Sequence, residues 1–122
     1  MKVIVNNNQI KTKDMTIPAT GIIPEVAAVR NVRVSNVQDA EGNSTNIVEA
    51  IRYDCVDPNT YACFTIKVEG GKPVVTEEVL EASPEVVYIQ IPVSEVSIKP
   101  YEIKYGIAKV SIVAPFVKLV QD

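Results

Sequence analysis

The sequence predicts an all-β protein, and three observations carry this prediction. Short runs rich in β-branched and aromatic residues recur along the chain, turn-forming residues separate these runs, and a helical pattern is confined to one short segment. The 122 residues fit a single domain, 1–122.

The first 27 residues are expected to form an N-terminal strand or arm. They contain an apolar run at 2–5, a turn of three asparagines at 6–8 and a second apolar run at 15–23. Pro18 and Gly21 interrupt the second run, and proline cannot donate a hydrogen bond to a central ladder. This run therefore belongs at a sheet edge or in an arm.

Three strands joined as a meander are expected next, at 26–38, 45–56 and 61–69. The turn DAEGNS separates the first two, and DPNT separates the second and third, which together form a hairpin. Alternation puts Val32 and Val34 of the first strand on one face, and Asn31, Arg33 and Ser35 on the other. In the third strand, alternation puts Phe64, Ile66 and Val68 on one face and Tyr61, Thr65 and Lys67 on the other.

A short helix and two further strands follow the meander. Thr76 is a suitable cap for a helix of one or two turns that ends by Pro84. Strands are expected at 86–93 and 106–120, whereas the segment 94–105 is mixed and Pro100 breaks it. This element order matches a five-stranded, OB-like Greek-key barrel with one short helix, and a β-sandwich is the alternative.

Composition narrows the possible functions. The formal net charge is −3, so a nucleic-acid site would have to be a local basic patch. The chain has no histidine, and the spacing of Cys55 and Cys63 is not that of zinc ligands. We therefore expect no enzyme activity, no metal and no cofactor. The N-terminus lacks the apolar region of a secretory signal, which predicts a cytoplasmic protein whose two thiols are reduced.

Aromatic and basic residues on the expected outward faces are the candidate binding residues. Aromatic rings stack on the bases of single-stranded nucleic acids, and Lys or Arg follows the backbone. The candidates for nucleic-acid binding are Arg52, Tyr61, Lys67, Tyr88, Tyr105 and Lys109. Since Arg52 and Tyr53 point to opposite faces of a regular strand, only one of them can join such a surface.

The central and C-terminal runs also resemble a known family. VRNVRVSNVQDAEGNSTNIVEAIRYDCVDPNTYACFTIKV and the ending YGIAKVSIVAPFVKLV are similar to small accessory proteins of Gram-positive integrative conjugative elements, which include a helicase processivity factor. The resemblance covers 28–120 in outline, but VTEEVLEASPE and the proline-rich segment 92–100 depart from it. It implies a replication role beside a helicase and single-stranded DNA. Phage OB-fold single-stranded-DNA-binding proteins are a similar alternative.

Two functions thus stay open. The first is a non-enzymatic, single-stranded nucleic-acid-binding or DNA-replication accessory protein of a bacterial mobile element or phage, with a helicase or other replication protein as a further partner. The second is a structural protein of the phage virion type, which would form a homo-oligomer through exposed edges and the arm 15–24.

Overall fold

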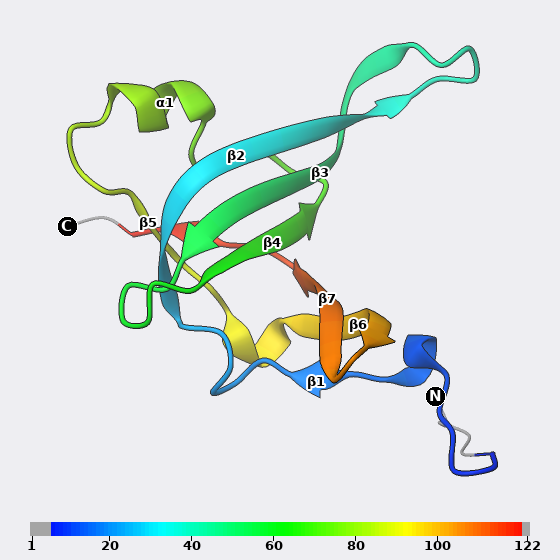
Figure 1. Ribbon diagram of the computed structural model, residues 1–122. Coiled ribbons are helices and arrows are strands. Elements are labelled where there is room, and N and C mark those ends of the chain that lie inside the picture. Colours follow the sequence, from blue (N-terminus) through cyan, green and yellow to red (C-terminus); the bar gives the residue numbers. More distant parts are fainter. Residues whose placement is uncertain (1–5, 121–122) are drawn as a thin grey trace.

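A computed structural model describes residues 6–120, and this part of the chain is mostly β (Figure 1). It contains eight strands, one α-helix and two single-turn 3₁₀ helices. In chain order the elements are η1 (Thr12–Asp14), β1 (Ile17–Pro18), β2 (Val26–Gln38), β3 (Ser44–Val56), β4 (Cys63–Glu69), α1 (Glu77–Ala82), β5 (Tyr88–Gln90), η2 (Val93–Glu95), β6 (Ser97–Lys104), β7 (Ile107–Ala114) and β8 (Lys118–Leu119).

All eight strands belong to one sheet, with the order β1-β6-β7-β4-β3-β2-β5-β8. Neighbouring strands are antiparallel except β4 and β7, which are parallel. The all-β prediction is confirmed, but the expected number of five strands is wrong. A single sheet also argues against the sandwich alternative, which requires two packed sheets.

The additional strands arise where prolines divide the chain. The strand expected at 86–93 is limited to β5, because the chain turns at Pro92 into η2. The mixed segment 94–105 nevertheless forms β6, and Pro100 is tolerated because β1 pairs with β6 only at Ser97 and Ile98. Pro115 divides the last expected strand into β7 and β8.

The N-terminal arm is partly described. Asn7 and Asn8 form the expected turn, both with positive φ, and β1 pairs with β6 at one end of the sheet, as expected for a proline-containing edge strand. The apolar run expected at 2–5 lies outside the described residues.

The central hairpin and the helix follow the sequence closely. β3 and β4 pair antiparallel from Ala50–Glu69 to Val56–Cys63, and the Thr76 hydroxyl accepts the Val79 N–H as the cap of α1. No helix among residues 6–120 is both long and apolar enough to cross a membrane.

One hydrophobic core lies on the inner side of the curved sheet. Its largest fully buried side chains are Tyr53, Ile51, Ile66, Ile89 and Cys55. The Tyr53 hydroxyl accepts the Val74 N–H at 3.1 Å, so the segment before α1 is joined to the centre of the core. Burial raises the pKa of Tyr53, although this hydrogen bond acts in the opposite direction.

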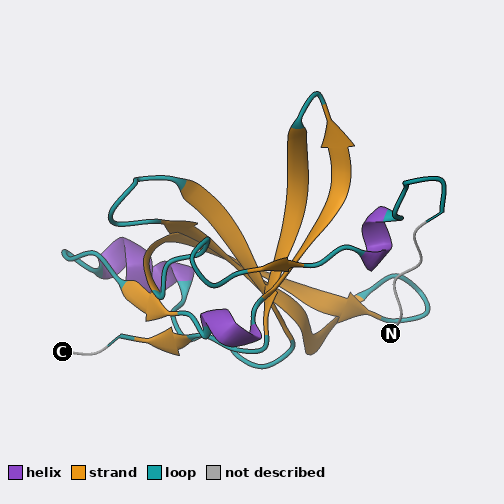
Figure 2. Cartoon of the chain, turned by 90° about the horizontal axis from the view of Figure 1, so that it is seen from below, coloured by secondary structure: helices purple, strands orange, loops and turns teal. Residues whose placement is uncertain are grey.

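Two hairpins extend beyond this core. Figure 2 shows β6 and β7 as a two-stranded ribbon that stands out at the top of the view, with the β2–β3 turn pointing elsewhere. All residues from 101 to 111 are exposed, so the outer part of the ribbon packs on nothing in the described chain.

Candidate nucleic-acid interface

The outward face of β2, β3 and β4 carries rows of polar side chains, and it is here called the polar face. Residues paired across neighbouring strands share a face of the sheet. The pairing therefore aligns rows of outward side chains opposite the buried Val32, Tyr53 and Ile66. The polar face consists of Asn31, Arg33, Ser35, Arg52, Asp54, Thr65, Lys67 and Glu69.

One row of the polar face is cationic on all three strands. Arg33 pairs with Arg52, and Arg52 pairs with Lys67. Directly opposite residues have Cβ atoms about 5 Å apart, and like charges at that distance destabilise a sheet. The Arg33–Arg52–Lys67 row is therefore more costly to fold than a neutral row.

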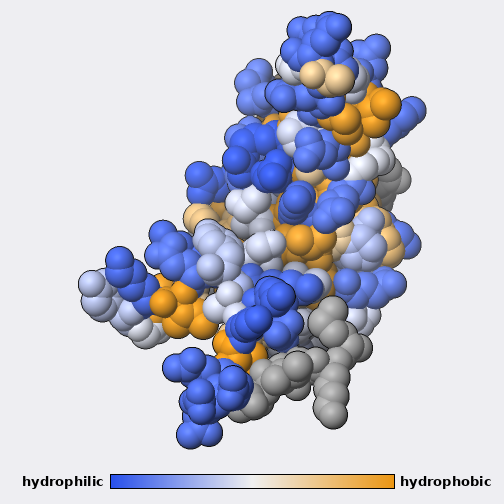
Figure 3. Space-filling view, turned by 90° about the vertical axis from the view of Figure 1, so that its right-hand side faces the viewer, coloured by the Kyte–Doolittle hydropathy of each residue, from blue (hydrophilic) through white to orange (hydrophobic). Residues whose placement is uncertain are grey.

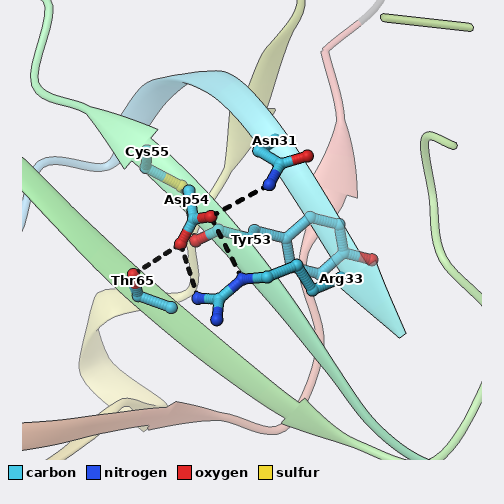
Figure 4. A network of polar contacts seen from close by, with 6 residues as sticks. All are labelled: Asn31, Arg33, Tyr53, Asp54, Cys55 and Thr65. Atoms are coloured by element: carbon cyan, nitrogen blue, oxygen red, sulfur yellow. Dashed lines mark hydrogen bonds and ion pairs between the residues drawn. The ribbon is translucent and has the colours of Figure 1, made fainter. Parts of the chain in front are cut away.

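Asp54 neutralises one end of this row (Figure 4). Its carboxylate accepts hydrogen bonds from Arg33 Nη2 at 2.8 Å and Nε at 3.2 Å, from the Thr65 hydroxyl at 2.7 Å and from the Asn31 amide at 3.4 Å. Partial burial acts to raise the pKa of Asp54, but the hydrogen bonds from Thr65 and Arg33 outweigh it and the pKa is lowered. Arg33 is thus held in an ion pair.

Arg52 and Lys67 have no such carboxylate. The ion pairs within the described part of the chain are Arg33–Asp54 and Lys109–Glu102. Arg52 instead donates to the Ser35 hydroxyl at 3.3 Å. The polar face therefore presents two neighbouring, half-buried cations without an ionic partner, and both were candidates from sequence.

Tyr105 and Lys109 lie together on the β6–β7 ribbon. Tyr105 and Gly106 form its turn with φ of 53° and 76°, and Tyr105 is 91% exposed. Lys104 Nζ lies 5.4 Å from the centre of this ring. Lys109 pairs with Glu102 at 3.7 Å, which reduces its value as a phosphate ligand.

Tyr61 and Tyr88 lie apart from the cationic pair. Tyr61 lies in the turn before β4, has a φ of 61° and is 79% exposed, so its assignment to the strand face with Thr65 and Lys67 is wrong. Tyr88 is on β5 opposite Ala28, which lies about 16 Å along β2 from Arg33 at 3.3 Å per residue. The six candidates therefore do not form one cluster.

The two cysteines point to opposite faces. Cys55 pairs with Phe64 and is buried, whereas Cys63 pairs with Val56, is exposed and accepts a hydrogen bond from Arg30 Nη1 at 3.1 Å. Both thiols are free, and burial raises the pKa of Cys55 to about 12. No group of metal-ligating residues is found within residues 6–120.

Arg33 and Asp54 were missed as members of the site. The sequence shows Arg33 alternating with Val32 and Val34, but which residue of β3 lies opposite Arg33 depends on a bulge at Arg30.

In comparisons with known proteins, no family model, curated protein or solved structure matches this chain.

Proposed function

We propose that this protein binds single-stranded nucleic acid without catalysing a reaction, as a DNA-replication accessory protein of a bacterial mobile element or phage. The observation that carries the proposal is the Arg52–Lys67 pair at the centre of the polar face. Two adjacent cations without carboxylate partners suit the phosphates of one strand, because Lys and Arg track a nucleic-acid backbone. The resemblance to conjugative-element accessory proteins supplies the biological setting.

The connectivity supports an OB-like arrangement. β2, β3 and β4 form a meander, and β5 returns through α1 to lie beside β2, which is the spatial order of a Greek key. β5 and β6 are consecutive and flank η2, so together they resemble one interrupted strand that connects β2 on one side with β7 on the other. β7 then pairs with β4. In this interpretation β1 and β8 are additions to an OB-like ring.

OB-folds bind oligonucleotides on the face of their second and third strands and on the loops between strands 1 and 2 and between strands 4 and 5. The corresponding elements here are β3 with Arg52, β4 with Lys67, and the β6–β7 turn with Tyr105. The β2–β3 turn carries Asp39 and Glu41. We therefore expect the strand to run from the polar face toward the β6–β7 ribbon, away from these carboxylates.

Anisotropy of a labelled oligothymidine, titrated with protein over a range of salt concentrations, tests this proposal. Each phosphate contact contributes about −0.7 to the slope of log affinity against log salt for a single strand. Arg52→Gln and Lys67→Gln should each reduce the steepness of this slope by about that amount. Lys118→Gln, which removes the same charge on β8, should leave the slope unchanged.

Tyr105→Ala adds a test of stacking and should weaken binding by about 1 to 3 kcal/mol. A duplex of equal length should bind less tightly than the oligothymidine. The proposal fails if the wild-type protein does not bind at low salt, or if all three charge variants behave alike.

A second function, assembly into a structural homo-oligomer, is favoured by one observation. The β6–β7 ribbon exposes Tyr101, Ile103 and Ile107, and the edges of its outer part pair with no strand of the described chain. Sedimentation at increasing concentration separates the two functions: a large oligomer that ignores oligothymidine would favour assembly.

A further inference from the structure

A groove beside α1 has apolar walls that nothing in the described chain covers. It runs between α1, the segment 83–87, β5 and β8. Val79 is 52% and Val86 61% exposed, and Tyr88, Leu119 and Val120 are also exposed. Apolar side chains gathered along a groove are typical of a binding surface, whereas single exposed ones are ordinary. Figure 3 shows the other side of the molecule, the right-hand side of Figure 1, where hydrophobic residues also reach the surface among hydrophilic ones.

Four glutamates lie in this groove or on α1 beside it, and they are here called the acidic rim. Glu77, Glu78 and Glu81 are exposed on α1, and Glu85 lines the groove itself. The segment 73–98 contains five glutamates and no lysine or arginine. Because the whole chain carries a formal charge of −3 and this segment −5, the remaining residues together carry +2.

Lys118, which precedes Leu119 of the groove, does not neutralise the rim. Lys118 on β8 has its Nζ 5.7 Å from the centre of the Phe116 ring, and none of the four glutamates of the rim is in an ion pair of the described chain. The acidic rim is therefore available to an external cation, and its charge is opposite to that of the Arg52–Lys67 pair.

We propose that this groove binds a basic, amphipathic peptide segment of a partner protein. Its apolar side chains would contact Val79, Val86 and Leu119, and its lysines or arginines would meet the glutamates of the rim. Charge complementarity selects this occupant over the others. Nucleic acid and anionic membranes are repelled by the rim, and a symmetric contact between two copies would bring two acidic rims together.

The first experiment uses a short peptide of alternating lysine and leucine, titrated into the ¹⁵N-labelled protein. Amide resonances of residues 74–88 and 118–120 should shift, and those of the polar face should not. Peptides in which glutamate replaces lysine, or serine replaces leucine, should not shift them. Shifts spread over the surface or confined to another region would overturn the proposal, as would the absence of binding.

Two variants test the contribution of each wall. Val86→Asn should weaken peptide binding about tenfold, which is the effect of losing one buried valine, and it leaves the charge of the groove unchanged. Glu78→Gln combined with Glu85→Gln should weaken binding and make it less sensitive to salt. Ile47→Asn, a similar change at an exposed position near the β2–β3 turn, should leave peptide affinity unchanged. Equal affinity of Val86→Asn and wild type would exclude the groove.

The outcome does not depend on nucleic-acid binding. Val86→Asn should bind oligothymidine as the wild type does, so the two proposals can fail separately. A wild-type dimer that Val86→Asn dissociates would mean that a second copy occupies the groove, and this result would also refute the peptide proposal.

Discussion

Asp54→Asn is the most informative single change, because every hydrogen bond to this carboxylate is donated by its neighbours. Oδ1 accepts from Thr65 and Arg33 Nη2, and Oδ2 accepts from Asn31 and Arg33 Nε. An asparagine amide has one oxygen and one NH₂ group. Thr65 can rotate its hydroxyl and Asn31 its amide so that each accepts a hydrogen bond. An Arg33 N–H nevertheless points at each of the two positions that Oδ1 and Oδ2 occupy in the wild type. Whichever way the new amide turns, one donor faces a donor.

The expected loss of stability follows from this geometry. A hydrogen bond to a charged group contributes about 1.5 to 3 kcal/mol, and exposed ion pairs about 0.2 to 1 kcal/mol. The Arg33 side chain is 53% exposed and that of Asp54 27% exposed, so solvent screening reduces the larger figure. We expect a loss of about 1 to 2 kcal/mol at pH 7 in urea denaturation followed by circular dichroism.

The pH dependence provides a second measurement of the same interaction. Since the pKa of Asp54 is lowered on folding, its contribution to stability is present above its ordinary value of 3.8. That contribution disappears as the pH falls through the lowered pKa. The stabilities of wild type and Asp54→Asn should therefore converge at acidic pH, below the ordinary value.

Glu102→Gln is the matched control. It removes the exposed carboxylate that lies 3.7 Å from Lys109 and should change stability by less than about 0.5 kcal/mol. A loss below that limit for Asp54→Asn at pH 7 would refute the reasoning. So would a difference from wild type that persists at acidic pH, because a charge-dependent interaction must vanish when the carboxylate is protonated.

Three further predictions concern the core, the thiols and the helix. Tyr53→Phe removes the acceptor of the Val74 N–H and should cost about 1 to 2 kcal/mol in urea denaturation. In the native protein, a thiol reagent at pH 8 should modify Cys63 rapidly, whereas Cys55 should react only on unfolding because it is buried and its pKa is about 12. Thr76→Ala removes the cap of α1 and should cost about 1 kcal/mol by thermal denaturation, or roughly 4 °C.

Each of these predictions has a clear contradicting result. Unchanged stability of Tyr53→Phe would mean that water satisfies the Val74 amide. Two native thiols that react at the same rate would mean that Cys55 is accessible. Thr76→Ser keeps a hydroxyl at the cap, and a loss equal to that of Thr76→Ala would mean that the hydroxyl is not responsible.

Local patterns in the sequence were sufficient for the elements that depend on near neighbours. The β3–β4 hairpin, the capped helix and the edge position of β1 follow from alternation, turn residues and the missing N–H of proline. The strand number depends on where prolines end one strand and allow another. Pro100 is compatible with β6 only because β1 leaves most of its outer edge unpaired, and a neighbour of this kind cannot be read from the segment alone.

The candidate site was predicted only in part, because it depends on register. Arg52 and Lys67 were selected as outward residues, and the structure adds that they are directly opposite. Arg33 and its partner Asp54 are 21 residues apart, and a one-residue change in pairing would separate them. Tyr61 was misassigned because the turn is longer than DPNT, and the backbone at Tyr61 is left-handed.

The irregularity at Arg30 has a consequence for how this protein could evolve. Val29 pairs with Cys55 and Asn31 with Asp54, so Arg30 is an extra residue on β2 that has no partner on β3. Its deletion would remove the bulge and keep every pairing on both sides of it. Deleting one residue here would thus straighten the strand without changing which side chains face the core. At most other positions in a strand, such a deletion turns inward-facing side chains outward and outward-facing ones inward. Length variation at this position would change how far the sheet bends while preserving which side chains reach the solvent.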